Sequence, residues 1–174
     1  MLMLIILNQD KPSQVIYNFM DSKGLDNWCV VDDRVMGGLS KGNVKLTETG
    51  NAIYFGDVTT ENNGGFSLLR YQFHSIDVSN FNKIAIKLKG DGTPYQFRIK
   101  SDKRQGFSYV SNFKTSGNWE TIIIPLNKFT PQFRGRKVNV QNFKEDKIEE
   151  IAFLIGNKIK ESFKLEIKSI TLIK

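Results

Sequence analysis

The sequence has little of the chemistry from which most enzyme and metal sites are built. Its 174 residues include one cysteine, Cys29, and one histidine, His74. One cysteine cannot form a disulfide within the chain, and one histidine makes a zinc site or a nucleophile–histidine pair improbable. Cys29 lies in an apolar run beside Trp28, so we expect it to be a small buried side chain. His74 shares the strand parity of polar residues and is expected at the surface.

Long hydrophobic runs and internal repeats are also missing. The apolar run 1–7 has no basic region before it and is too short to cross a membrane, so we expect no membrane span and a cytoplasmic protein. The alternative is a periplasmic protein in which residues 1–7 are the remnant of a signal peptide. No stretch has the composition of a linker, so residues 1–174 are predicted to form a single domain, with residues 1–11 as an N-terminal extension.

Acidic residues are fewer than basic ones. The chain has 25 Lys and Arg against 18 Asp and Glu, a net charge of +7, with the densest basic clusters at 100–104 and 134–137. A basic surface can attract nucleic acid, acidic lipid or an acidic protein. The sequence matches no nucleic-acid-binding module, so we do not expect a nucleic acid partner.

What the sequence does have is alternation of apolar and polar residues with a period of two, which is typical of half-buried strands. Residues 83–89, 119–126 and 148–155 are predicted strands, and residues 94–113 are a predicted hairpin. Helical signal is confined to short segments: residues 12–20 fit a strand or a helical turn, and residues 125–129 fit a short turn of helix. About ten short strands predict an all-β fold, an antiparallel β-sandwich or barrel.

The C-terminal strand changes phase along its length. Phe163, Leu165 and Ile167 share one parity, whereas Ile170 and Leu172 share the other. One extra residue resets the phase, so we predict a β-bulge near residues 168–169.

The segment 28–40 is the most distinctive part of the chain, because it combines a tryptophan, two adjacent carboxylates, an arginine and a glycine pair. Asp32 and Asp33 are neighbours on an extended chain, so their side chains are expected to point to opposite faces and not to form an acid–base pair. The glycine pairs 37–38 and 64–65 suit tight reversals. Calcium bound by carboxylates of this region, with Asp57 and Glu61, is a minority alternative, since no spacing is diagnostic.

A carbohydrate-binding face is a further alternative. It would use exposed aromatic side chains beside polar groups such as Gln96, Arg98, Ser108 and Asn112. Alternation favours the hydrophobic core over such a platform for most of these rings. The rings concerned are Tyr95, Phe107, Tyr109, Phe113 and Trp119.

The distinctive segment resembles the family of complex I intermediate-associated protein 30, and the resemblance runs from about residue 28 to residue 173. It rests on Trp28-(x)3-Asp32-Asp33-x-Val35-Met36-Gly37-Gly38-x-Ser40, Phe55-Gly56, Asn62-x-Gly64-Gly65-Phe66 and Arg70, with later agreement at 119–136, 151–155 and 163–167. The resemblance implies a galactose-binding-like β-sandwich, or jelly roll. It also implies a non-catalytic role, since mitochondrial members help to assemble respiratory complex I. The run 1–7 is neither basic nor amphipathic, which suggests a bacterial-type member.

The leading hypothesis is therefore a non-catalytic protein that binds a protein partner in the manner of a chaperone-like assembly factor, with no cofactor, no metal and no catalytic residue. Its candidate contact residues are Asp32, Asp33, Arg34, Ser40, Asn62, Arg70 and Arg134. Its candidate structural residues are Trp28, Met36, Gly37, Gly38, Gly64, Gly65 and Phe66. We also expect Arg34 or Arg70 to pair with one of the two aspartates.

Overall fold

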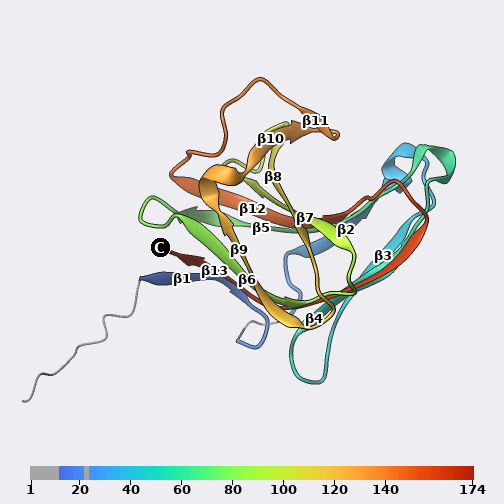
Figure 1. Cartoon of the computed structure of the whole chain (residues 1–174), viewed down its shortest axis with the longest axis horizontal. Coiled ribbons are helices and arrows are strands. Elements are labelled where there is room, and N and C mark those ends of the chain that lie inside the picture. The colour runs from blue at the N-terminus through green and yellow to red at the C-terminus, as the bar shows by residue number, and fades with distance from the viewer. Residues whose placement is uncertain (1–11, 22–23) are drawn as a thin grey trace, which may run out of the picture.

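The computed structural model describes residues 12–21 and 24–174, and these form two antiparallel sheets packed face to face (Figure 1). The predicted extension and the apolar run 1–7 lie outside the described residues. The first sheet has the order β3 (Lys41–Leu46), β4 (Ala52–Val58), β13 (Glu161–Ile173), β6 (Lys83–Lys89), β9 (Trp119–Pro125), and β1 (Ser13–Asn18) pairs with the end of β13.

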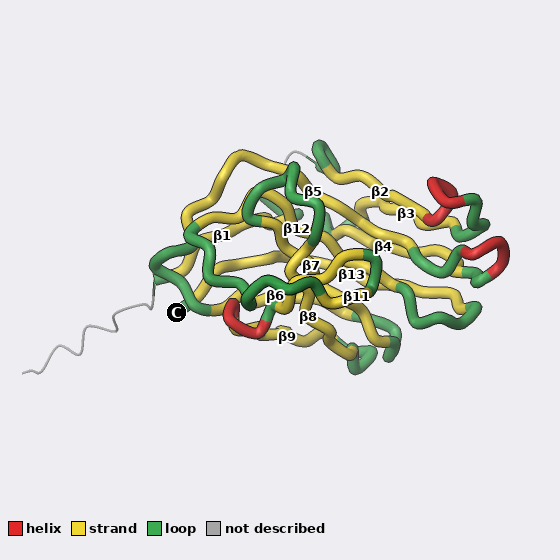
Figure 2. Tube along the Cα trace, turned by 90° about the horizontal axis from the view of Figure 1, so that it is seen from above, coloured by secondary structure: helices red, strands yellow, loops and turns green. Residues whose placement is uncertain are grey.

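The second sheet contains the distinctive segment at its edge. Its order is β11 (Arg136–Lys137), β10 (Thr130–Phe133), β8 (Ser108–Lys114), β7 (Pro94–Lys100), β12 (Lys147–Ile155), β5 (Ser67–Asp77), β2 (Trp28–Asp32). Three short 3-10 turns complete the fold: η1 (Asp33–Met36), η2 (Glu61–Asn63) and η3 (Leu126–Lys128). The turns η1 and η2 lie at one end of the sandwich and η3 at the other (Figure 2). No helix of the described residues is long and apolar enough to cross a membrane.

The all-β sandwich predicted from alternation is confirmed, with residues 12–20 contributing a strand and residues 125–129 a short helical turn. The predicted bulge is confirmed as well, because the register of β13 against β6 shifts between Ile167 and Ser169. The shift keeps Ile167 and Ile170 both in the core between the sheets. One prediction is wrong: the Cys29 side chain is exposed. Trp28 takes the buried position of β2, so its neighbour points outward.

Candidate functional site

The Asp33 carboxylate is the centre of a buried hydrogen-bond cluster at the end of the sandwich. The chain leaves β2 and turns into η1, and this turn directs the Asp33 side chain inward, where it has no exposed surface. Oδ1 accepts a hydrogen bond from the Ser40 amide at 3.0 Å, and Oδ2 accepts one from the Ser40 hydroxyl at 2.5 Å. Oδ2 also accepts the amides of Gly65 at 2.6 Å and Phe66 at 3.3 Å. One carboxylate therefore ties the segment 33–40 to the loop before β5.

Asp32 has a separate set of partners. Its Oδ1 accepts the Ser67 hydroxyl at 2.6 Å, and both of its carboxylate oxygens lie 3.0–3.1 Å from the amide nitrogen of Gly42. These partners join β2 to β3 and β5, whereas Asp33 holds the loops beyond the strand ends. The two aspartates therefore have separate sets of partners.

The glycines of the cluster are needed because the Asp33 carboxylate is packed directly against their backbone. A Cβ atom on Gly38 would collide with the Asp33 carboxylate, and one on Gly64 would lie 2.5 Å from Asp33 Oδ2. Gly37 closes η1 in the left-handed region with φ of 91°, a conformation that glycine adopts without steric cost. The cluster is built by close approach of backbone to carboxylate as much as by turn geometry.

The electrostatics of Asp33 follow from these contacts. Burial alone raises the pKa of the Asp33 carboxyl, but hydrogen bonds from the Ser40 side chain and from the amides of Gly65, Phe66 and Ser40 outweigh it, so the pKa lies below its ordinary value. The carboxylate is therefore charged at neutral pH, and its charge is compensated by dipoles instead of by a cation.

The candidate contact residues do not form one site. Asp33 and Ser40 belong to the buried cluster, and Asp32 lies next to it with its own partners. Asn62 is exposed on η2 near the same end. Arg134 lies in the turn after β10 with its guanidinium 5.3 Å from the Phe133 ring centroid.

The expected arginine–aspartate pair is not found among the described residues. The partners of Asp32 and Asp33 there are hydroxyls and backbone amides, and these donors already occupy both oxygens of each carboxylate. Arg34 is exposed on η1, and Arg70 lies on the outer face of the second sheet, where its strand position opposes Cys29 and Ala152. The prediction of a buried ion pair is therefore wrong.

Three large apolar side chains of the distinctive segment lie at the surface. Val35 is 74% exposed, Met36 49% and Leu39 53%, and Arg34 beside them is exposed too. Met36, which the sequence placed in the structural group, is thus available for contact. We call residues 34–39 the motif loop. Its exposed apolar residues were missed because a short run beside two glycines gives no periodicity from which burial can be judged.

The aromatic platform considered from the sequence does not form. The rings of Tyr95, Tyr109 and Phe113 are buried in the core or at its edge. Trp119 is partly exposed, but it lies on β9 of the first sheet, so it cannot share a face with the strands of the second. The outer face of β5, β7 and β12 carries polar side chains such as Gln72, Gln96 and Arg98 beside the aliphatic Leu68 and Leu154.

No group of three or more His, Cys, Asp or Glu side chains that could hold a metal ion occurs in the described part of the chain. Asp32 and Asp33 direct their oxygens at hydrogen-bond donors of the protein, and Asp57 accepts the Ser162 hydroxyl at 2.5 Å. Three of the four carboxylates that the calcium alternative would use, those of Asp32, Asp33 and Asp57, are therefore engaged in separate contacts.

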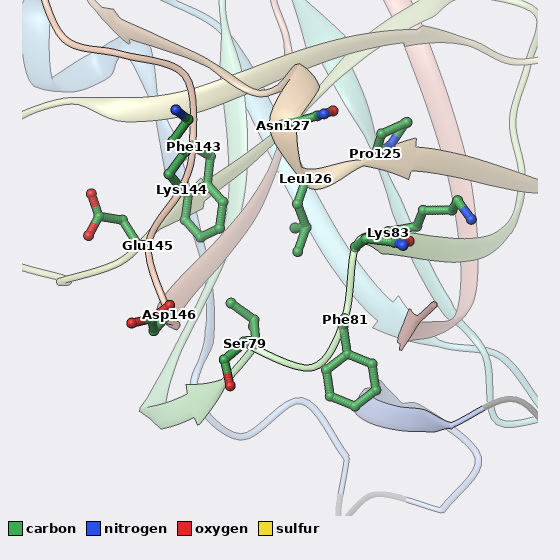
Figure 3. A pocket seen from close by; sticks show the side chains of 12 residues that line it. Ser79, Phe81, Lys83, Pro125, Leu126, Asn127, Phe143, Lys144, Glu145 and Asp146 are labelled. Atoms are coloured by element: carbon green, nitrogen blue, oxygen red, sulfur yellow. The ribbon is translucent and has the colours of Figure 1, made fainter.

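A hollow of about 450 Å³ lies at the η3 end, remote from the motif loop (Figures 2 and 3). Glu145 and Asp146 lie at one side of it and Lys83 at the other (Figure 3). Two carboxylates beside a hollow invite comparison with a glycoside hydrolase, which places a charged carboxylate and a desolvated carboxylic acid on either side of the sugar. Glu145 and Asp146 are consecutive on one loop and both are exposed, so they do not form such a pair.

Comparison with known proteins agrees with the sequence motif. The family model described as Complex I intermediate-associated protein 30 matches residues 17–167. A mouse protein named Complex I intermediate-associated protein 30, mitochondrial, is 29% identical over 178 residues, which cover 89% of this chain and 54% of the mouse protein. A probable counterpart from Caenorhabditis briggsae is 26% identical and covers 89% of this chain and 52% of that protein. The chain spans about half the length of the curated relatives it matches.

Solved structures of similar fold include carbohydrate-binding modules. A family 11 module from Clostridium thermocellum, in complex with a β-1,3-1,4-mixed-linked tetrasaccharide, has a TM-score of 0.69 at 24% identity and covers 92% of this chain and 95% of its own. A structure described as CBM4 has a TM-score of 0.56 at 12% identity, covering 92% and 99%. At these identities the likeness shows the fold alone. The family match, by contrast, extends over most of the sequence, and the chain belongs to the complex I intermediate-associated protein 30 family.

Proposed function

We propose that this protein is a non-catalytic binding protein that acts through protein–protein contacts, in the manner of a respiratory complex I assembly factor. The observation that carries the proposal is the motif loop, in which Val35, Met36 and Leu39 are exposed beside Arg34 on a segment held by the Asp33 carboxylate. Family membership and the names of the mouse and nematode relatives support the assembly role.

The chemistry of the motif loop suits a contact surface. Methionine and arginine are enriched in protein interfaces, and clustered apolar side chains at the surface gain free energy when a partner removes them from water. The loop is held in place on both sides, because Asp33 anchors its start and Ser40 its end. A loop that is already ordered loses little conformational entropy when it binds, so more of the contact energy appears as affinity.

The experiment is an affinity purification of the tagged protein from its native host. We expect the unmodified protein to recover complex I subunits or assembly intermediates, and a Val35→Ser/Met36→Ser double variant to lose them. Ile123→Ser is the matched control, because Ile123 is equally exposed but lies on β9 of the other sheet. Recovery of no respiratory-chain protein, or equal recovery by the double variant, contradicts the proposal. Cell fractionation tests the predicted cytoplasmic location in the same strain.

Carbohydrate binding is the second candidate function. The observation that favours it is the outer face of the second sheet, where Gln72 of β5, Gln96 of β7 and Asn112 of β8 present amide groups in a fold shared with carbohydrate-binding modules. Amide groups donate and accept hydrogen bonds, which matches the hydroxyls of a sugar. A glycan array tests this candidate, and an array without binding contradicts it.

A further inference from the structure

Two arginines flank a small side chain on the outer face of the second sheet. Ala152 of β12 lies opposite Arg70 of β5 on one side and opposite Arg98 of β7 on the other. Residues that are directly opposite in antiparallel strands point to the same face, so both guanidinium groups lie on the side of Ala152. The two arginines are two strand spacings apart, about 10 Å between backbones.

Arg70 is the unusual member of the pair. The structure gives it no hydrogen-bond or ion-pair partner among the described residues, and its Nε atom is buried. A buried donor without an acceptor costs free energy. The Arg70 side chain as a whole is only half-buried, so its terminal nitrogen atoms can donate to an acceptor that a ligand supplies. Arg34 likewise has no ion-pair partner among the described residues, but it is exposed to water, and its donors need no acceptor from a ligand.

Arg98 is oriented by its neighbour on the same strand. Its Nε and Nη2 atoms donate to Gln96 Oε1 at 3.1 and 2.7 Å, which holds the guanidinium plane over the face. Burial lowers the pKa of Arg98, and the Glu150 carboxylate nearby raises it in part. The group remains charged and partly desolvated, and a cation in that environment is attracted strongly to an anion.

The face carries one carboxylate, Glu150, which is 4% exposed. It accepts the Gln72 amide at 2.6 Å, and its Oε1 atom lies 3.8 Å from the Lys100 ammonium. Glu150 is thus engaged with residues one row away from Arg70. Its single charge cannot balance Arg70, Arg98 and Lys100 together, and the face stays positive.

The side chain between the two arginines is small. Ala152 is 1% exposed, so its neighbours cover it, and a longer side chain at this position would have to displace them. Three rows of paired residues cross the outer face of the second sheet at this point, and we call them together the polar face. No aromatic residue is among its described members. The rows are Gln72, Glu150, Lys100; Cys29, Arg70, Ala152, Arg98, Val110; and Val31, Leu68, Leu154, Gln96, Asn112.

We infer that the polar face binds an acidic oligosaccharide, one whose sugar rings carry carboxylates, with Arg70 as the principal carboxylate ligand. Guanidinium groups bind carboxylates in a planar, bidentate way, and Arg70 has its donors free for this. The amides of Gln72, Gln96 and Asn112 lie on the same face and match sugar hydroxyls. A neutral glycan would find no aromatic ring to stack on among the described members of the face. An acidic peptide offers carboxylates, but it has no series of hydroxyls for these amides. The inference rests on the second candidate function and is independent of the motif loop.

The test is isothermal titration calorimetry, in which oligogalacturonate is titrated into the whole chain and its binding affinity is measured. We expect binding that weakens as salt is added, because the contact is ionic. Arg70→Gln should weaken binding by about tenfold or more, the loss typical of one charged hydrogen bond or a bidentate pair. Lys89→Gln is the matched control, since Lys89 is an exposed cation on β6 of the opposite sheet and its loss should leave the affinity unchanged.

A structural role for Arg70 is distinguished by its effect on folding. Removal of a partly buried donor without a partner should leave the thermal midpoint unchanged or raise it, whereas loss of a structural contact would lower it. Ala152→Leu, which places a longer side chain between the two arginines and retains both of them, is the second variant and should abolish binding.

Four results overturn the inference. Binding of a neutral mixed-linkage β-glucan as tight as that of oligogalacturonate would retain carbohydrate binding but remove the acidic specificity. Equal binding of oligoglutamate would show that charge alone is recognised. Unchanged affinity in Arg70→Gln would place the ligand elsewhere. No binding of any of these probes would remove the site altogether.

Discussion

Replacement of Asp33 by asparagine tests whether the buried carboxylate holds the end of the sandwich together. The substitution keeps the size of the side chain but turns one oxygen into an NH₂ donor. The favourable orientation keeps oxygen at the Oδ2 position, which accepts from the Ser40 hydroxyl and from the amides of Gly65 and Phe66. The new NH₂ group then faces the Ser40 amide, which is also a donor.

The cost follows from these four contacts. One hydrogen bond to a charged acceptor is lost outright, which is worth about 1.5–3 kcal/mol, and the other three are weakened because a neutral oxygen is a poorer acceptor. A neutral amide costs less free energy to bury than a charged carboxylate, and this difference offsets part of the loss. We therefore expect Asp33→Asn to lower the free energy of unfolding by about 2–4 kcal/mol, or the thermal midpoint by roughly 5–15 °C for a chain of this length.

The assay is urea and thermal unfolding at pH 7, followed by circular dichroism. Asp26→Asn is the matched control, since Asp26 is exposed and has no side-chain hydrogen bond or ion pair with any residue in the described ranges 12–21 and 24–174. It should change the free energy of unfolding by less than about 0.5 kcal/mol. If Asp33→Asn costs no more than Asp26→Asn, the four hydrogen bonds contribute little and the cluster is not a stabilising element.

Three further predictions follow from the same geometry. The pKa of the Asp33 carboxyl is lower in the folded chain than in the unfolded one, so its stabilisation is full above about pH 4. That stabilisation is lost as the pH falls through the folded pKa. The free energy of unfolding, measured from pH 7 down to acid pH, should therefore fall less in Asp33→Asn than in the unmodified protein. Gly64→Ala should destabilise the fold by about 1–3 kcal/mol, because its Cβ would lie 2.5 Å from Asp33 Oδ2; a variant with the unmodified unfolding midpoint would contradict the close packing. Cys29 should react with a thiol reagent in the folded protein, and protection until unfolding would show that its side chain is buried after all.

Alternation was sufficient to predict many of the strands and which of their side chains face the core. Because the side chains of a strand point alternately to opposite faces, the run from Phe163 to Leu172 specified both its core face and the place of its bulge. The same rule predicted that Tyr95 and Tyr109 belong to the core. The pairing of strands far apart in sequence, such as β12 between β5 and β7, could not be predicted, since it depends on which edges meet in space.

The site was harder to predict, and the errors have a physical origin. Cys29 has apolar neighbours on both sides in sequence, but β2 is an edge strand whose outer face is partly open, so apolar neighbours did not imply burial. The aspartates were expected to take arginine partners because both residue types occur in the same motif. Composition cannot show that the carboxylates accept hydrogen bonds from hydroxyls and backbone amides instead of from arginines.

This choice of partners has a consequence for the surface. Because Asp32 and Asp33 are satisfied by uncharged donors, their two negative charges lie inside the fold or at its edge and neutralise no cation. Arg34 in the motif loop and Arg70 on β5 therefore have no acidic partner among the described residues, and they lie at two separate places. Both cations are left to water or to a ligand, and each adds to the net charge of +7 that the chain carries.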